Sequence, residues 1–469
     1  MKKILLTALM ASTAIAYSQD GTWDPTFNIG TGAEISVNGI DALPDGKILI
    51  AGQFVQYNGQ VVNGLARLNG NGDLDTSFTS PATPMPISKT FIDEDGSIVY
   101  ATIYPGSILK RLDPDGFEDD SFITPAFPGL SEIVSISKQG NKYIVSGAFQ
   151  VNVNSPEPLS CIVRLNANGS LDETFAPVRL YAANTPYAIT LVLPDGKIIA
   201  VGRFEYYGET PVANLIRLNA DGTLDDTFDA GTGIMGQTMS LALQPDGKVI
   251  VGGLFSTVNG VTRNMIARIN TDGSVDDTFV PAAGDSVSAL DLIIQPDGKI
   301  VAGGNFHDSE VIFGEDDNSI PVYIKRFNND GSVDATFASE QSVGNQVWAL
   351  SLQNDGKLLA GGWFETVGGV SKNRLARLNN TVLSVKDYHM AGLSVYPNPV
   401  NDKLTIDTAA FNSATANVTV YDITGKMVYN VEQSVTGNIQ IDMASYNTGL
   451  YLVTVSAENK TLTQKVIKN

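Results

Sequence analysis

The sequence predicts an all-β protein, a seven-bladed β-propeller followed by a small C-terminal Ig-like β-sandwich. A repeat of roughly fifty residues fills the middle of the chain, and each copy carries two turn signals between alternating apolar segments. The copies are also permuted so that the two ends of the array complement each other. The composition agrees: 45 glycines, 21 prolines and 43% hydrophobic residues suit short strands joined by tight turns.

The first eighteen residues have the order of a secretory signal peptide. Lys2 and Lys3 precede an apolar run, and small residues follow. We expect residues 1–18 to be removed, with cleavage after Ala16 or after Ser18. The apolar run is too short to span a bilayer comfortably and no later stretch is long enough, so we expect no membrane span.

One repeat reads Pro-Asp-Gly-Lys, an apolar run, Gly-Gly-x-Phe, about a dozen residues, and then Arg-Leu-Asn-x-Asp-Gly-x-Leu-Asp-x-Thr-Phe. The clearest copy runs from Leu241 to Phe279. Its two turns predict about four strands, the content of one propeller blade. An arginine marks each copy, 44 to 58 residues after the one before: Arg67, Arg111, Arg164, Arg217, Arg268, Arg326 and Arg377.

The order of the motifs around these arginines indicates a closed ring. An Asp-x-Ser/Thr-Phe motif follows each arginine except Arg377, and an extra copy from Asp24 to Phe27 has no arginine segment before it. We therefore expect Asp24–Phe27 to complete the blade that Arg377 begins, within a propeller over residues 20–383. Closure removes exposed sheet edges, and a solenoid, the alternative, has no need of this permutation.

These motifs resemble the delta-60 repeats of secreted bacterial proteins, over residues 20–383. The resemblance implies a propeller-like fold and no single activity. Two copies depart from the pattern, because Ser97 replaces the lysine of the second and Gln139-Gly140 replaces Asp-Gly in the third. The number of blades is therefore least certain around these two copies.

We expect the recurring arginines and aspartates to be structural, because a residue that occurs seven times suits a scaffold better than one binding site. Pairs such as Arg217 with Asp225 and Arg268 with Asp276 could bridge strands within or between blades. Partly buried arginine–carboxylate pairs favour such bidentate geometry.

A linker over 384–392 leads to a tail over 393–469, where alternating apolar residues and Asn, Gly and Pro turns predict the β-sandwich. Three motifs of the tail resemble the type A C-terminal sorting domain of the Bacteroidota type IX secretion system. The resemblance implies that type IX machinery carries the protein from the periplasm across the outer membrane, with release or surface attachment after the tail is removed. The residues that carry it are Pro397, Asn398, Pro399, Gly425, Lys426, Gly449 and Tyr451.

Charge and rare residues exclude several functions. Fifty acidic against 30 basic residues give a net charge of −20, which opposes binding to nucleic acid. Cys161 is the single cysteine, so no intrachain disulfide can form. His307 and His389 are the only histidines, which argues against histidine-based hydrolysis or metal chemistry. We predict no catalytic, metal-binding or cofactor-binding constellation.

One loop stands out as a candidate binding loop. From Phe306 to Arg326 the chain runs 20 residues, where four other blades use 13. Inserted loops on a rigid scaffold often carry binding, although a loop without function is the favoured interpretation of this pattern. The candidate residues are His307, Asp308, Glu310, Glu315, Asp316 and Asp317.

Calcium is the one cofactor for which the sequence offers a candidate site. The turn Asn219–Asp225 has alternating oxygen ligands around a glycine, as calcium loops do, but it lacks the bidentate glutamate at the twelfth position. A turn stabilised by its own aspartate side chain is the favoured interpretation.

The preferred functional hypothesis is a non-enzymatic binding or adhesion module, secreted or on the outer cell surface. We expect a monomeric propeller that recognises a glycan or a protein through loops on one face. The alternative is a secreted polysaccharide hydrolase or lyase that uses carboxylates of the propeller face. A structural component of the cell surface is a third possibility.

Overall fold

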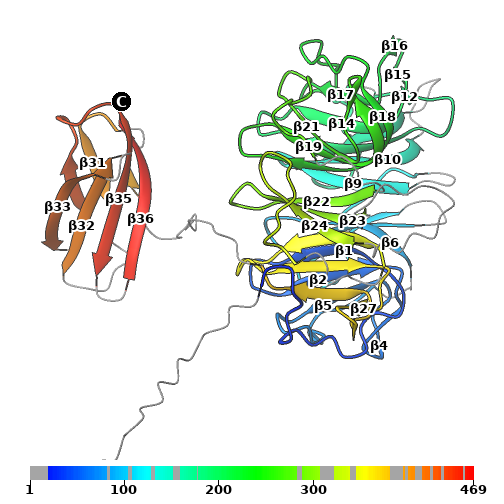
Figure 1. Cartoon of the computed structure of the whole chain (residues 1–469), viewed down its shortest axis with the longest axis horizontal. Helices are drawn as coiled ribbons and strands as arrows, with labels where there is room; N and C mark the ends of the chain where they lie inside the picture. Colours follow the sequence, from blue (N-terminus) through cyan, green and yellow to red (C-terminus); the bar gives the residue numbers. More distant parts are fainter. Residues whose placement is uncertain are drawn as a thin grey trace, which may run out of the picture. The chain divides into compact units, whose positions relative to one another are not determined.

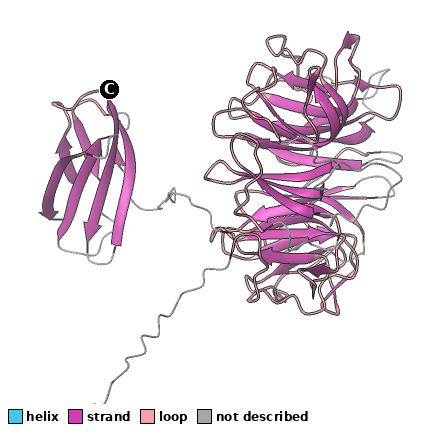
Figure 2. Cartoon of the chain, viewed as in Figure 1, coloured by secondary structure: helices cyan, strands magenta, loops and turns pink. Residues whose placement is uncertain are grey.

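Figure 1 shows a computed structural model of the whole chain. It describes residues 19–468 apart from 82–84, 104–107, 128–131, 152–158, 177, 282–287, 307–321, 339–344, 381–394, 397–399, 407–414, 423–425, 435–437 and 458–459. Every regular element among these residues is a strand, so the all-β prediction is confirmed (Figure 2). The chain forms two compact units, Met1–Leu383 and Ser384–Asn469, which we describe separately.

The described part of the first unit holds seven antiparallel sheets of one topology, in which the second strand pairs with the first and the third (Figure 1). They are β1 (Val37–Ala42), β2 (Ile48–Gly52) and β5 (Leu65–Leu68); β6 (Ile87–Ile92), β7 (Ile98–Thr102) and β8 (Leu109–Leu112); β9 (Glu132–Gln139), β10 (Lys142–Val151) and β11 (Leu159–Leu165); β13 (Tyr187–Val192), β14 (Ile198–Arg203) and β17 (Leu215–Leu218); β18 (Ile234–Leu243), β19 (Val249–Val258) and β21 (Ile266–Ile269); β22 (Ser288–Ile294), β23 (Ile300–Phe306) and β24 (Val322–Phe327); β25 (Val347–Leu352), β26 (Leu358–Gly362) and β29 (Leu375–Leu378).

The fourth strand that each repeat predicts is reduced to a single bridge. Leu68 pairs with Leu74 after a tight turn in which Gly72 donates its N–H to the carbonyl of Asn69. A second turn follows at once, because Phe78 donates its N–H to the carbonyl of Asp75. Two turns in such close succession leave no room for a longer strand. The same bridge recurs at Leu112 with Glu118, Leu165 with Leu171, Leu218 with Leu224, Ile269 with Val275, and Phe327 with Val333.

Short strands decorate the connection between the second and third strands of several sheets. The turn at Asn58 and Gly59, with φ of 48° and 75°, joins one such pair, as Asn-Gly favours in a tight hairpin. The short strands are β3 (Gln56–Tyr57) and β4 (Gln60–Val61); β15 (Tyr206–Tyr207) and β16 (Thr210–Pro211); β20 (Val261–Thr262), which pairs with β19; and β27 (Thr366–Val367) and β28 (Val370–Ser371). A further short strand, β12 (Leu180–Tyr181), precedes β13 and pairs with β15.

The first strands of the seven sheets lie next to one another in a cycle. β1 contacts β6, and the contacts continue through β9, β13, β18 and β22 to β25, which contacts β1 again. The described strands therefore form a β-propeller, with each sheet as a blade. Apolar residues of neighbouring blades pack together: Ile40 and Ile50 of the first blade, for example, share one core cluster with Leu359 of the last.

The seam, which we define as Gly21–Phe27 with Arg377–Asn379, joins the two ends of the propeller. Trp23 forms the bridge to Leu378 that the last blade otherwise lacks. Asp24 donates its N–H to the carbonyl of Arg377 at 2.8 Å, and Asn379 donates its N–H to the carbonyl of Thr22 at 2.7 Å. The chain's early segment thus supplies the outer part of the blade made by β25, β26 and β29.

The second unit consists of two sheets over one hydrophobic core. Buried residues such as Leu404, Val418 and Val453 form that core, and they come from both sheets. The strands are β30 (Val395–Tyr396), β31 (Lys403–Ile406) and β34 (Ile439–Asp442) in one sheet, and β33 (Met427–Ser434), β32 (Thr415–Asp422), β35 (Gly449–Ala457) and β36 (Lys460–Lys468) in the other.

A search of the described residues for a long apolar helix that could cross a membrane finds none.

Candidate functional site

The two ends of each blade differ in chemistry. At the turn end, the Pro-Asp-Gly-Lys turn joins the first strand to the second, and the Arg-Leu-Asn segment enters its own turn. At the loop end, the second strand leaves after its glycines and the chain crosses to the third strand. The turn end repeats one motif in almost every blade, whereas the loop end varies. Site-specific chemistry is therefore to be sought at the loop end.

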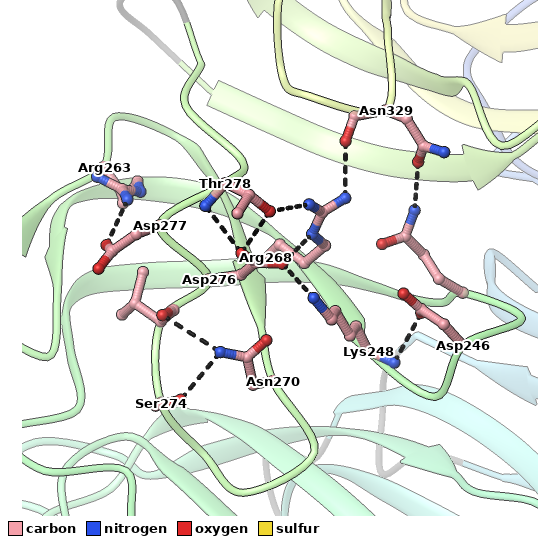
Figure 3. A network of polar contacts seen from close by, with 12 residues as sticks. Asp246, Lys248, Arg263, Arg268, Asn270, Ser274, Asp276, Asp277, Thr278 and Asn329 are labelled. Carbon is pink, nitrogen blue, oxygen red and sulfur yellow. Dashed lines mark hydrogen bonds and ion pairs between the residues drawn. The ribbon is translucent and has the colours of Figure 1, made fainter.

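The repeated polar cluster at the turn end is shown for one blade in Figure 3. Asp276 accepts a hydrogen bond from Nε of Arg268 at 2.7 Å and another from Nζ of Lys248 at 2.6 Å. Its second oxygen accepts from the hydroxyl and the N–H of Thr278. The guanidinium carbon of Arg268 lies 5.0 Å from the ring centroid of Phe279. Every polar residue of the motif therefore has its partner within the motif.

Burial and hydrogen bonding oppose each other in this cluster. Burial alone would raise the pKa of Asp276, but the hydrogen bonds from Lys248, Thr278 and Arg268 outweigh it and hold that pKa well below its usual range. The carboxylate therefore stays charged at neutral pH. A buried, fully partnered carboxylate of this kind stabilises the fold and has no free oxygen for a ligand.

The same arginines also link each blade to the next. Arg268 donates from Nη1 to the carbonyl of Asn329 in the following blade at 2.7 Å (Figure 3). The other blades repeat this contact, from Arg67 to Pro114, Arg111 to Ala167, Arg164 to Ala220, Arg217 to Thr271 and Arg377 to Gly70. Arg326 instead reaches the side chains of Asp20 and Asn380. The contacts of the recurring arginines thus lie both within and between blades.

The seam has the same cluster, assembled from the two ends of the propeller. Arg377 donates from Nε to Asp24 at 2.9 Å, and Lys357 donates to the same oxygen at 2.5 Å. The guanidinium carbon of Arg377 lies 4.6 Å from the ring centroid of Phe27.

Two tryptophans stack at the loop end of the blade formed by β25, β26 and β29. The ring centroids of Trp348 and Trp363 are 6.3 Å apart and their planes meet at 28°. Trp363 is 41% exposed, a large apolar area to leave in water. Trp348 is half-buried and donates from Nε1 to Oε1 of Gln346 at 3.0 Å.

Both tryptophans occupy positions that vary between blades. Trp348 falls at an irregularity between Val347 and Ala349, where the register of β25 against β26 shifts, and such bulges redirect a side chain. Trp363 is the variable residue of Gly-Gly-x-Phe, and its counterparts in other blades are Gln53, Arg203, Leu254 and Asn305.

Arg374 completes this aromatic site, which we define as Gln346, Trp348, Trp363, Glu365 and Arg374. The guanidinium carbon of Arg374 lies 4.8 Å from the ring centroid of Trp363, and Nη2 lies 3.3 Å from Oε1 of Glu365. The backbone of Arg374 has a φ of 68°, a region that disfavours a side chain. Its buried Nε has no partner among the described residues. Residues at the same position of other blades, such as Asn214 and Met265 with φ of 62° and 64°, share this conformation, so it belongs to the repeat.

A second polar group lies among the first strands. Asp291 of β22 accepts N–H hydrogen bonds from Leu292 and, in the next blade, from Leu350 at 2.7 Å. Asp41 of β1 accepts a hydrogen bond from the hydroxyl of Thr90 at 2.6 Å. Burial raises the pKa of both carboxyl groups, and the charge of Lys89 partly offsets it in each. These hydrogen bonds fasten adjacent first strands together, so we interpret both carboxylates as structural.

Several residues singled out in the sequence lie outside the described residues. These are the signal peptide at 1–18, the linker at 384–392, the candidate loop residues His307, Asp308, Glu310, Glu315, Asp316 and Asp317, and Pro397, Asn398, Pro399 and Gly425 of the sorting motif. Lys426 precedes β33, while Gly449 and Tyr451 belong to β35.

The turn weighed as a calcium loop is held by its own side chain. Asp221 accepts from the N–H and the hydroxyl of Thr223 at 3.1 Å and 2.7 Å. Among the residues that the structure describes, no three His, Cys, Asp or Glu side chains are grouped so that they could hold a metal ion.

Sequence reasoning did not identify the aromatic site. Its signal was nevertheless present, because the chain has three tryptophans and two of them, Trp348 and Trp363, stand in one repeat at positions where the other repeats vary.

Comparison with protein families matches two parts of the chain. Residues 394–469 match the secretion system C-terminal sorting domain. Residues 43–78, 141–175, 193–228, 244–279, 295–337 and 353–381 match the β-propeller described as a domain of unknown function, DUF5122. The second repeat, in which Ser97 replaces the lysine, lies outside the matched ranges.

Among characterised proteins, the chain is similar to ulvan lyase NLR42 of Nonlabens ulvanivorans, with 27% identity over 161 residues. The match covers 30% of this chain and 29% of that enzyme, so the chain spans less than a third of the enzyme's length.

The solved structures that the comparison matches share little sequence with this chain and have low TM-scores. A protein of unknown function from Bacteroides caccae has a TM-score of 0.29 at 10% identity, covering 64% of this chain and 80% of that one. The Dos1 propeller has a TM-score of 0.26 at 10% identity and covers 93% of both chains. YCF48 bound to D1 peptide has a TM-score of 0.30 at 13% identity, covering 63% of this chain and 93% of that one. Likenesses this distant say nothing about function.

The sorting domain directs the protein through the type IX secretion machinery, so the protein is released or displayed at the cell surface. The chain thus combines DUF5122 β-propeller repeats with a type IX C-terminal sorting domain, and it is an exported β-propeller protein.

Proposed function

We propose that the exported propeller is a non-enzymatic binding module that holds a neutral glycan at the aromatic site. One observation carries the proposal: Trp348 and Trp363 stack at a loop end, with 41% of Trp363 exposed. Two stacked rings, one of them well exposed, offer a flat apolar face on which a ligand can pack.

The residues of the aromatic site match the surface of a sugar. A pyranose ring offers C–H groups to an aromatic side chain and hydroxyl groups at its rim, which can both donate and accept hydrogen bonds. Glu365 can accept from such hydroxyls, since its side chain is 74% exposed. Arg374 packs against Trp363, with its guanidinium carbon 4.8 Å from the ring centroid, and so holds that ring in place.

Net charge favours a neutral glycan over an acidic one. The chain carries a formal charge of −20, so a polyanion is repelled at long range and more strongly at low salt. Within the aromatic site Glu365 offsets the charge of Arg374. A neutral polysaccharide meets neither obstacle.

The test is a binding assay of the purified protein on an array of neutral and acidic polysaccharides, run together with an assay for soluble products. We expect retention on neutral glycans without product. Trp363→Ala should weaken that retention at least tenfold, because aromatic anchors dominate binding energy. Leu254→Ala is the matched control, since Leu254 holds the same repeat position in another blade and is 50% exposed.

Unchanged retention of Trp363→Ala, or equal loss in Leu254→Ala, would contradict a site built on the tryptophans. Retention on acidic glycans alone would contradict the charge argument, and it would indicate that the positive charge of Arg374 outweighs the net negative charge of the chain.

A second candidate function is a polysaccharide lyase or hydrolase, and two observations favour it. The similarity to an ulvan lyase covers 161 residues. Asp41 and Asp291 have raised pKa values, as an acid catalyst near neutral pH requires, with burial as the largest cause. In this reading they would transfer protons to and from a sugar chain.

The same array decides between the two. Release of unsaturated or reducing ends from any polysaccharide, abolished by Asp291→Asn with retention on the array intact, would establish the enzyme and displace the binding module. The hydrogen bonds of Asp291 to Leu292 and Leu350 favour the structural interpretation.

A further inference from the structure

We propose a second binding site, in a cavity between two blades, that takes a neutral molecule with one aromatic ring. The cavity lies at the turn end between the blade of β13, β14 and β17 and the blade of β18, β19 and β21. The aromatic site lies at the loop end of another blade, so the two sites are independent.

The cavity has about 220 Å³ of space and apolar walls. Aliphatic side chains from the two blades face each other across it, and turn residues stand at its rim. The apolar lining residues are Leu193, Ile199, Leu215, Phe228, Leu243, Val249, Val251 and Ile269.

The apolar cluster around the cavity is incompletely covered. Phe228 is half-buried, whereas the phenylalanines at the same position of the motif in other blades are buried, from Phe279 at 0% to Phe78 at 8%. Leu193 and Leu243 are half-buried beside it. A ligand that fills the cavity would cover all three side chains and gain their apolar contact.

Leu193 distinguishes this gap from the gaps on either side of it. In the blades before and after, a glutamine crosses the corresponding gap. Gln139 donates to the carbonyl of Ala220 at 3.0 Å, and Gln244 donates to Oδ1 of Asn329 at 3.3 Å. Leu193 holds this position here, just before the Pro-Asp-Gly turn, and an aliphatic side chain cannot make that bridge.

The polar groups at the rim specify a neutral ligand. Arg217 is the one cation in the lining, and its donors are engaged by Asp225 at 2.6 Å, by the carbonyl of Thr271, and by the hydroxyl of Thr227 at 3.1 Å. A carboxylate or phosphate that entered the cavity would lose its hydration without gaining a free donor. A neutral aromatic ring loses little hydration free energy when it enters the cavity.

The volume sets the size of the ligand. An apolar cavity of roughly 150 Å³ in another protein stays dry and binds benzene. About 220 Å³ therefore accommodates one substituted six-membered ring, but it is too small for two fused rings with substituents.

The experiment titrates the full chain with toluene and with benzoate while the methyl NMR signals of Ile199, Leu215 and Val251 are followed. We expect toluene to shift these signals saturably, and benzoate at the same concentration to leave them in place.

Two variants of one residue test the explanation. Leu193→Gln introduces the residue that the neighbouring blades tolerate, and it should weaken toluene binding at least tenfold. Leu193→Met keeps an apolar side chain of similar volume and should bind toluene within about threefold of the unsubstituted chain.

Leu43→Gln is the matched control, because Leu43 precedes the same turn in the first blade, outside the cavity lining. It should leave toluene binding unchanged, as should Trp363→Ala. The proposal is overturned if toluene gives no saturable shift of these methyl signals, if benzoate binds as well as toluene, or if Leu193→Gln binds as the unsubstituted chain does.

Discussion

Arg377 donates a hydrogen bond to Asp24 at 2.9 Å, although 353 positions of sequence separate the two residues. The pair is buried, with side-chain exposures of 8% and 2%. It joins the last repeat to the first segment of the propeller, so its loss should destabilise the closed ring.

Asp24→Ala should lower the free energy of unfolding by about 3–5 kcal/mol, because it leaves the buried Arg377 and the half-buried Lys357 without their carboxylate. Urea denaturation measures the change. Asp226→Ala, which removes an exposed aspartate, should cost less than about 0.5 kcal/mol. Equal free energies of unfolding of the two variants would show that the hydrogen bonds of Asp24 do not stabilise the propeller.

Stability should fall in acid. The pKa values of Asp24, Asp75, Asp172, Asp225, Asp276 and Asp334 are held low by hydrogen bonds that outweigh burial. Their contribution is therefore complete above the unfolded value of about 3.9 and is lost as the pH falls toward their folded values. Asp41 and Asp291 have raised pKa values and act in the opposite sense, but they are fewer.

Urea midpoints measured between about pH 7 and pH 3 test this sign. We expect a decline that steepens below about pH 4, and a shallower decline for Asp276→Asn, which takes up one proton fewer on unfolding. A midpoint that is constant or rises toward pH 3 would contradict the assignment.

Arg374→Gly should separate stability from binding. Glycine relieves the φ of 68°, which offsets the lost contact with Trp363, so the free energy of unfolding should change by less than about 1 kcal/mol. Glycan retention should fall at least tenfold, because the group that packs against Trp363 and fixes its ring is gone. Gly64 stands at the same position in the first blade, which shows that the repeat accommodates glycine. Undiminished retention would remove Arg374 from the site.

Deletion of residues 393–469 should leave the propeller folded and trap it in the periplasm. The two units have separate cores, so the propeller does not need the tail for stability. Fractionation of cells that express the full-length and truncated chains measures the outcome. Normal surface display of the truncated protein would contradict the role of the sorting domain.

The fold could be predicted because the repeated motif is complete in most copies and is divided between the two ends of the array in one. The missing Asp-Phe segment after Arg377 and the surplus one at Asp24 point to each other in the sequence alone, and the structure pairs Trp23 with Leu378 at that place. The fourth strand was overestimated, since Asn69–Asp73 and Asp75–Phe78 turn too closely to leave more than a bridge.

The sites were less accessible to sequence reasoning. A search for titratable clusters passes over Trp348 and Trp363, because stacking across a bulge depends on register. The cavity beside Leu193 lies where neighbouring blades have a glutamine that crosses the gap. A sequence alone does not show that these glutamines reach the next blade.

The pairing of Trp23 with Leu378 also sets an order of events in folding. The segment that finishes the propeller is made first, yet its partner strand is made last, so Phe27 and the edge of β29 stay uncovered until nearly the whole propeller exists. Contacts this distant in sequence form slowly, and open strand edges invite association with other chains. We therefore expect the incomplete propeller to be prone to association with other chains until its two ends have paired.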